Sequence, residues 1–126
     1  MEIRLLLKIY HLIMRNRKEI FMDTLQLARY FADYLMKYGA QNVDILEAKN
    51  GKVFNFMVVC TAEDKNHALN MLVDFLDYVS TEFKMVNLGI EGYKKSDWII
   101  VDFNKIFVHI FQPKTREKFN IERLWK

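Results

Sequence analysis

The segment DWIIVDFNKIFVHIF, residues 97–111, constrains the fold of this chain more than any other stretch. Two runs rich in β-branched and aromatic residues flank Asn104 and Lys105, a pattern that is typical of a β-hairpin. Asn104 tolerates the positive φ that a two-residue turn requires, whereas Lys105 is a less usual turn residue. With these two residues as the turn, the register places Trp98 opposite Phe111.

Side chains alternate between the two faces of such a hairpin, and the two faces differ in character. One face is wholly apolar and is expected to pack against helices; it comprises Ile99, Val101, Phe103, Ile106, Val108 and Ile110. The other, called the mixed face below, comprises Trp98, Ile100, Asp102, Phe107, His109 and Phe111. Because an unpaired buried carboxylate costs several kcal/mol, the end of the mixed face near Asp102 is expected to lie near solvent or a polar partner.

Two interpretations of the mixed face follow from the pattern. Aromatic side chains beside a few polar groups suit a surface that docks another protein, where one well-filled pocket can carry about 2 kcal/mol or more. Alternatively, a helix covers this face and His109 is a hydrogen-bonded core histidine. The residues alone leave both interpretations open.

The remaining pattern predicts a single α/β (α+β) domain with a mixed sheet of about five strands and helices packed on it. Helical periodicity indicates two core helices, and Pro113 suits the first turn of a short third helix. Apolar stripes are expected at Leu27, Tyr30, Phe31, Tyr34, Leu35 and Tyr38, and at Ala68, Leu69, Leu72, Val73, Phe75, Leu76 and Val79. The predicted elements are helices 24–40, 63–83 and 113–119, strands 43–48, 53–62 and 84–90 with a turn at 49–52, the hairpin, and an apolar anchor of Ile121, Leu124 and Trp125.

Residues 1–22 precede this domain, which we expect to span residues 23–126. Apolar residues at helical spacing, with five basic side chains among them, predict an amphipathic helical extension. It is expected to pack on the domain or on a partner chain, or to arise from an upstream start with Met22 as the natural one. Contact with a membrane surface and an organellar targeting role are weaker alternatives.

Charge and cysteine content narrow the class of protein. A formal net charge of +3 is too mild to indicate nucleic-acid binding by itself. Cys60 is the only cysteine and lies in an apolar run, which predicts a buried, reduced thiol. No run approaches the roughly 18 apolar residues that span a bilayer, so we expect no membrane partner. Bacterial cytoplasm is the expected location, ahead of a mitochondrion or plastid.

Catalytic and cofactor motifs are missing from the sequence. Asp102 and His109 would sit diagonally on one face, but no serine or cysteine nucleophile accompanies them. Three histidines and one cysteine show no metal-ligand spacing, and neither a Walker loop nor GxGxxG occurs. We therefore expect no enzyme activity, no cofactor and no metal site. A nucleotidyltransferase-like enzyme and an RNA-binding module remain as alternatives.

The C-terminal half resembles one known family. The segment from Ile90 to Trp125 follows the pattern of the ribosomal silencing factors, the RsfS or Iojap family. The matching residues are Glu91, Gly92, Trp98, Asp102, Val108, His109, Phe111, Pro113, Arg116, Glu122, Leu124 and Trp125. The sequence departs from the family pattern at the turn, where Phe103, Asn104 and Lys105 replace the usual Tyr-Gly-Asp, and residues 1–22 lie outside the resemblance.

The resemblance implies a nucleotidyltransferase-like topology without catalysis. It implies binding to the large ribosomal subunit through the ribosomal protein of the L-fourteen type, a block on joining of the small subunit, and thereby repression of translation. Peripheral contact with ribosomal RNA and a homodimer are further implied possibilities. On this reading the partner-binding residues are Trp98, Asp102, Phe103, His109, Phe111, Arg116 and Trp125.

Overall fold

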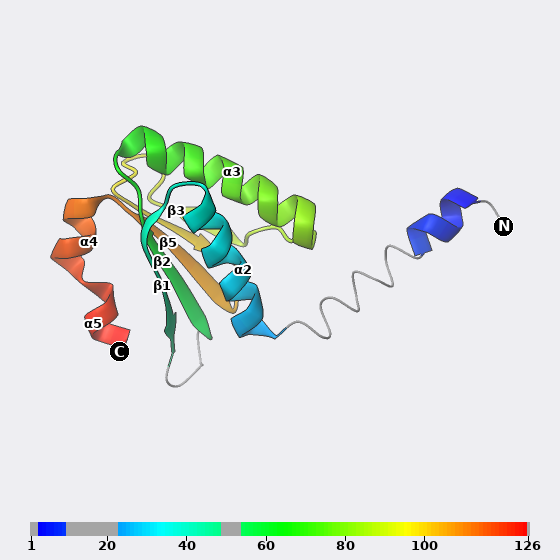
Figure 1. The fold of residues 1–126 in the computed structure, drawn as a ribbon, viewed down its shortest axis with the longest axis horizontal. Helices are drawn as coiled ribbons and strands as arrows, with labels where there is room; N and C mark the ends of the chain where they lie inside the picture. The colour runs from blue at the N-terminus through cyan, green and yellow to red at the C-terminus, as the bar shows by residue number, and fades with distance from the viewer. Residues whose placement is uncertain (1–2, 10–22, 49–53, 126) are drawn as a thin grey trace.

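The computed structural model describes residues 3–9, 23–48 and 54–125, and the side chain of Trp125 is not part of that description. Residues 3–9 are helical, while the rest of the predicted extension and the turn predicted at 49–52 lie outside the described residues. Figure 1 shows the elements, which are α2 (Thr24–Lys37), β1 (Gln41–Glu47), β2 (Phe56–Thr61), α3 (Lys65–Phe83), β3 (Gly89–Glu91), β4 (Trp98–Asp102), β5 (Ile106–Phe111), α4 (Pro113–Phe119) and α5 (Ile121–Trp125).

The five strands form one mixed sheet in the order β1-β2-β5-β4-β3, which confirms the predicted fold class. The pairs β1–β2, β5–β4 and β4–β3 are antiparallel, whereas β2 and β5 are parallel. A parallel pair needs a long connection, which here includes α3 and the strands β3 and β4. As a result β5 lies at the centre of the sheet, between β2 and β4.

The predicted register of the hairpin is confirmed along its whole length. Trp98 pairs with Phe111, and the pairs between them continue in step to Asp102 opposite Phe107. Asn104 has φ 73°, and its backbone N–H donates to Asp102 Oδ1 at 2.7 Å. The aspartate therefore stabilises the turn that sets which side chains share a face.

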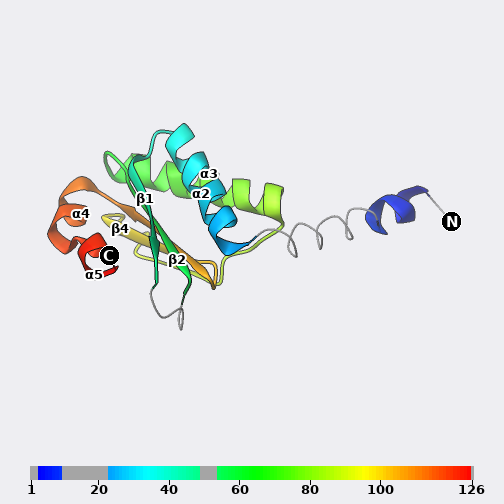
Figure 2. The same ribbon diagram turned by 60° about the horizontal axis from the view of Figure 1, so that its bottom comes forward.

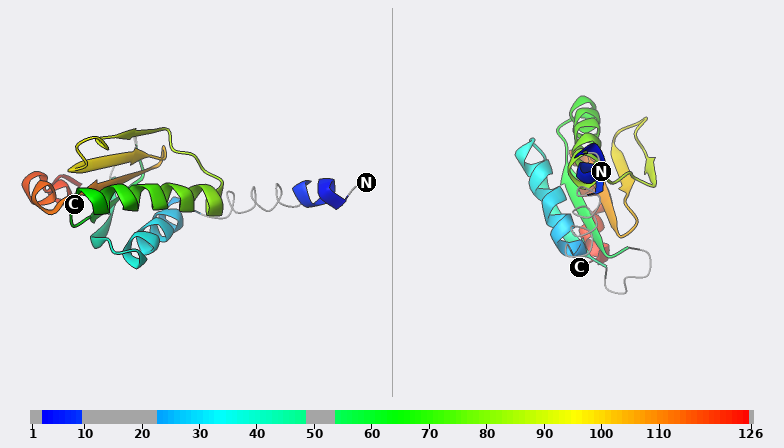
Figure 3. Two further views of the ribbon diagram at one scale, coloured as in Figure 1. Left: turned by 90° about the horizontal axis from the view of Figure 1, so that it is seen from above. Right: turned by 90° about the vertical axis from the view of Figure 1, so that its right-hand side faces the viewer.

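Helices α2 and α3 pack on the same side of the sheet, as both views in Figure 3 show. Each begins at an aspartate cap: Asp23 accepts from the Gln26 N–H at 2.7 Å, and Asp64 accepts from the His67 N–H at 2.8 Å. The apolar face of the hairpin lies beneath them, with every one of its six side chains buried. This layer is the main core of the domain.

The buried stripes on the two helices are narrower than the sequence pattern indicated. Tyr30 is 43% exposed, Tyr38 53% and Val73 64%, so their assignment to the core was wrong. Ala28 and Ala32 allow α2 to lie close to the sheet, which leaves the tyrosines on the flank of the helix. There the rings of Tyr34 and Tyr38 pack on each other with centroids 4.5 Å apart.

A second, smaller apolar cluster lies on the opposite side of the sheet. Its buried members are Leu46, Ala48, Phe54, Met57, Val59, Phe111 and Ile121, with Trp98 and Phe107 partly buried against them. Ile121 comes from α5, which lies with α4 beside β1 at one end of the sheet (Figure 2). Leu124, predicted to anchor this segment, is 77% exposed, so Ile121 supplies the contact and the prediction for Leu124 was wrong.

We predict that Gly92→Ala destabilises the domain by at least about 2 kcal/mol, because Gly92 combines a left-handed backbone with close packing. Its φ is +82°, and a Cβ there would lie 2.0 Å from the backbone oxygen of Trp98. Urea unfolding measures the change. Gly89→Ala is the matched control, since a Cβ at Gly89 meets nothing within 4 Å. Equal stability of the two variants would contradict the prediction.

Candidate docking surface

The mixed face is partly exposed and partly covered. Trp98, Ile100, Asp102 and Phe107 are half-buried, whereas His109 and Phe111 are buried at 4% and 0% exposure. The side chains therefore divide into an outer group that solvent reaches and an inner pair that supports it. Neither of the two interpretations left open by the sequence describes the whole face.

Trp98 packs against two phenylalanine rings. Its ring stacks on Phe111 with centroids 4.8 Å apart, and Phe119 at the end of α4 lies on it with centroids 5.1 Å apart. Phe119 is itself 47% exposed. Half-buried Trp98 and exposed Phe119 thus form an aromatic pair that joins β4 to the C-terminal segment.

His109 lies beneath this pair and makes one polar contact. Its Nδ1 accepts a hydrogen bond of 3.0 Å from the indole Nε1–H of Trp98, so this nitrogen does not donate to Asp102 as a catalytic Asp–His pair would need. Its Nε2 is buried and has no hydrogen-bond partner among the described residues. Burial lowers the pKa of His109 from 6.5 to about 4, so the imidazole is neutral at physiological pH.

The lowered pKa makes the domain sensitive to acid, and we expect His109 to contribute a measurable part of that sensitivity. Because the unfolded state protonates first, stability falls as the pH drops below 6.5 and stops falling below about 4. The loss attributable to His109 is about 2 kcal/mol between pH 7 and pH 4.5. Denaturant titrations of the wild type and of His109→Asn at both pH values measure it as a difference, and an equal loss in the two proteins would refute it.

Two other residues predicted to bind a partner have roles inside the domain. Phe103 is 6% exposed and packs in the main core, with its ring 5.3 Å from that of Phe31. Asp102 is half-buried and caps the hairpin turn through one carboxylate oxygen. Phe103 is therefore not available for a direct contact, because the turn directs it toward the helices.

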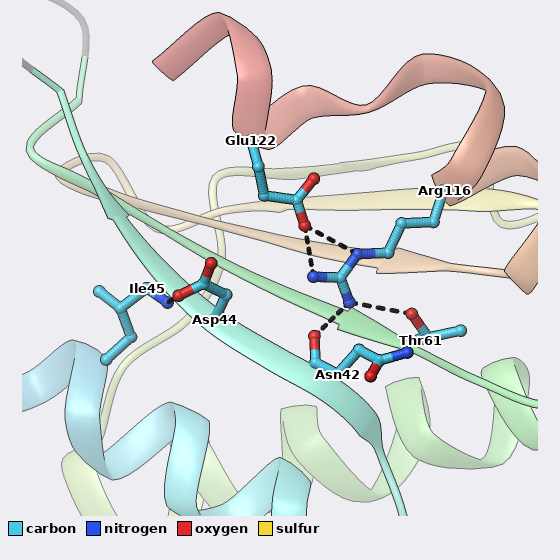
Figure 4. A network of polar contacts seen from close by, with 6 residues as sticks. All are labelled: Asn42, Asp44, Ile45, Thr61, Arg116 and Glu122. Atoms are coloured by element: carbon cyan, nitrogen blue, oxygen red, sulfur yellow. Dashed lines mark hydrogen bonds and ion pairs between the residues drawn. The ribbon is translucent and has the colours of Figure 1, made fainter. Parts of the chain in front are cut away.

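Arg116 is the centre of a polar network that joins the C-terminal segment to the sheet (Figure 4). Its Nε donates to Glu122 Oε1 at 2.9 Å, and its Nη2 forms an ion pair with the same carboxylate. Its Nη1 donates to Thr61 Oγ1 at 2.9 Å and to the backbone oxygen of Asn42. The Arg116 side chain, 13% exposed, thus contacts α5, β2 and β1 rather than standing free for a partner.

The same network lines an open pocket of about 510 Å³ next to α4. Its walls are Gln41, Asn42, Thr61, Pro113, Arg116, Glu117, Asn120 and Glu122. Carboxylates and amides dominate the wall, and the one guanidinium is already paired. The pocket is therefore an open surface depression lined mainly by polar residues.

Arg116→Lys is expected to destabilise the domain by about 2 kcal/mol, since an ammonium cannot reach the three acceptors that the guanidinium fork joins. Hydrogen exchange should increase in residues 113–125, because this network ties them to β1 and β2. The control is Arg123→Lys, on the exposed side of α5. Urea unfolding with hydrogen exchange tests this, and unchanged exchange in that segment would contradict it.

Sequence reasoning missed Phe119 as part of the surface. Its position at the end of a short helix that starts at Pro113 is the signal that could have found it, because it follows the hairpin strand by about two helical turns. The backbone of Trp125 lies in α5. The surface is therefore built from β4, β5 and α4 together.

Other chemical features of the described residues are limited. Cys60 is buried as predicted, and burial raises the pKa of its thiol to about 12. Within residues 3–9, 23–48 and 54–125, no three His, Cys, Asp or Glu side chains gather to hold a metal ion. Over the same residues, no helix has the length and apolar character to cross a membrane.

These features define a small α/β domain with an aromatic surface on one side of a mixed sheet. Comparison with known proteins places it more closely: the sequence profile of the family "Ribosomal silencing factor during starvation" (RsfS) matches residues 22–126. The chain belongs to this family.

Individual relatives agree with the assignment. The chain is 31% identical over 85 residues to the ribosomal silencing factor RsfS of Chromobacterium violaceum, covering 65% of this chain and 69% of that protein. It is 44% identical over 36 residues to mitochondrial assembly of ribosomal large subunit protein 1 of Mus musculus, covering 29% of this chain and 16% of that protein. A crystal structure from Chromobacterium violaceum shares the fold with TM-score 0.76 and 21% identity, covering 82% of this chain and 87% of that one.

Proposed function

We propose that this protein binds the large ribosomal subunit through the ribosomal protein of the L-fourteen type and blocks association with the small subunit, thereby repressing translation. Membership of the ribosomal silencing family supports the general role. The name of the mouse relative supports the large subunit as the partner. The aromatic pair of half-buried Trp98 and exposed Phe119 is the observation that carries the docking surface.

The mixed face suits protein docking better than catalysis. Trp98 supplies a large, half-buried ring that packs against two phenylalanines, which is the kind of anchor that dominates interface energetics. Ile100 and Phe107 extend the apolar area, and Asp102 sets a carboxylate at its edge. Blocking the association of the two ribosomal subunits requires affinity and bulk but no reaction, so we propose no enzyme activity.

The residues of this surface take two kinds of role. We propose that Trp98 and Asp102 contact the partner directly, and that Trp125 does so from α5. His109 and Phe111 support Trp98 from beneath, since both are buried. Phe103 and Arg116 act indirectly, by holding the hairpin and the C-terminal segment in place.

Exposed basic side chains lead us to propose further contacts. We propose that residues 23–126 are the functional domain and that exposed basic residues give peripheral contact with ribosomal RNA; these are Lys94, Lys95, Lys114, Lys118 and Arg123. An RNA-binding module would instead lose affinity with about one power of salt concentration per phosphate contact. A homodimer is a further proposal, and the bacterial cytoplasm is the proposed site of action.

The test is cosedimentation of the purified protein with separated ribosomal subunits, together with the yield of joined ribosomes. The wild type is expected to sediment with large subunits and to shift joined ribosomes toward free subunits. Trp98→Ala should weaken binding about 30-fold or more, the effect of losing a central interface residue worth 2 kcal/mol. Affinity is measured on folded protein, verified by circular dichroism.

Tyr30→Ala is the matched control, because Tyr30 is an aromatic residue 43% exposed on α2, on the other side of the sheet. It should bind large subunits as the wild type does. Absence of any wild-type protein in the large-subunit fraction would refute the proposed function. Equal weakening by Trp98→Ala and Tyr30→Ala would leave the mixed face without a role.

A further inference from the structure

Trp98 has one polar atom, and that atom is already used inside the domain. The indole Nε1–H donates to His109 Nδ1 at 3.0 Å, and the ring packs against Phe111 and Phe119. A half-buried ring with these three contacts has its side-chain rotamer selected before any partner arrives. Affinity benefits from such order, because the entropy of fixing the side chain is lost on folding rather than on binding.

The hydrogen bond also determines the tautomer of His109. A neutral imidazole carries one N–H, and Nδ1 must be the acceptor because the indole can only donate. The proton therefore lies on Nε2, which is buried and has no hydrogen-bond partner in the part of the chain that the structure describes. The other polar neighbour on this face, Asp102, uses its Oδ1 at the turn.

The hydrogen bond to Trp98 does not make His109 a stabilising residue for the fold, because its buried Nε2–H is left unpaired. An unpaired buried donor costs at least as much as one neutral hydrogen bond returns, so the histidine is not favoured simply as a core residue. An aliphatic side chain at position 109 would remove the unpaired donor and keep the apolar packing beside Val59 and Phe111. What it would not keep is the acceptor for the indole.

We infer that His109 is a positioning residue for partner docking: its Nδ1 holds the indole of Trp98 in one orientation, with the ring presented to the partner as an apolar surface whose N–H is already paired. The inference rests on the proposed function and deepens it. It specifies the chemistry of the complementary site, which is an apolar pocket that needs no hydrogen-bond acceptor for the tryptophan. Phe119 completes one wall of the ring's environment on the protein's own side.

The first test observes the Trp98–His109 hydrogen bond in the full chain without a partner. In ¹H–¹⁵N spectra the indole N–H of Trp98 should be shifted downfield and protected from solvent exchange, and Trp98→Phe assigns it against the indole signal of Trp125. His109→Leu should abolish that protection. His109→Asn should retain it, because Asn Oδ1 is attached to Cγ as His Nδ1 is. A rapidly exchanging Trp98 indole in the wild type would overturn the inference irrespective of any ribosome binding.

The second test measures affinity for large ribosomal subunits. His109→Leu is expected to weaken binding roughly fivefold to tenfold, the equivalent of about one hydrogen bond, and His109→Asn by less than about twofold. The effect of His109→Leu should disappear in a Trp98→Phe background, which has no indole N–H to hold. Urea unfolding of each variant separates this from loss of fold.

The outcomes separate the two proposals. If the wild type binds and His109→Leu binds equally well despite a freed indole, the positioning role is wrong and the proposed function stands. If His109→Leu weakens binding equally in the Trp98→Phe background, His109 acts without the indole and the inference also fails. If the wild type does not bind, the proposed function fails, while the spectra still report on the Trp98–His109 hydrogen bond.

Discussion

The packing of β5 against both of its neighbours is the constraint on which the rest of the structure depends. This strand is parallel to β2 and antiparallel to β4, so its hydrogen bonds join the two halves of the chain. Val108 and Ile110 are fully buried under α2 and α3, while His109 and Phe111 are buried on the opposite side. A strand buried on both faces cannot slip by one residue without exchanging its apolar and polar faces.

The surface on the far side of the sheet is a consequence of that fixed register. Trp98 pairs with Phe111, so the tryptophan reaches the mixed face only while β4 and β5 keep their alignment. The turn at Asn104, capped by Asp102, and the close approach of Gly92 to the Trp98 backbone hold the two ends of β4. The aromatic surface therefore depends on backbone geometry at residues outside the aromatic pair itself.

The sequence predicted the parts of the fold that depend on local periodicity. The alternating direction of side chains in β4 and β5 specified both faces, and a turn-tolerant Asn104 specified where the chain reverses and thereby the register. The set of buried residues on α2 and α3 was less predictable. Tyr30 and Val73 occupy positions whose burial depends on how closely each helix approaches the sheet. That distance depends on small residues such as Ala28 and on packing that a periodic pattern does not contain.

The sequence placed several candidate residues on one face, but it predicted neither their contacts nor the position of Phe119 beside them. Trp98 and His109 were expected on one face. The structure shows a hydrogen bond between these two residues, whereas the sequence had suggested His109 with Asp102. Register gives the positions of side chains, whereas rotamers decide which of several neighbours is bonded. Arg116 was a further case: a long side chain near a proposed surface instead reached three elements of its own domain.

The Arg116 network links the order of the C-terminal segment to the order of the aromatic surface. Arg116 and Phe119 both belong to α4, a helix with no buried residue of its own, so its position depends on the contacts at its two ends. Ion pairing to Glu122 and hydrogen bonds to Thr61 and Asn42 fix one side, and the ring of Phe119 on Trp98 fixes the other. Loosening either contact should loosen the other, because a short helix without an apolar face has little else to hold it to the sheet.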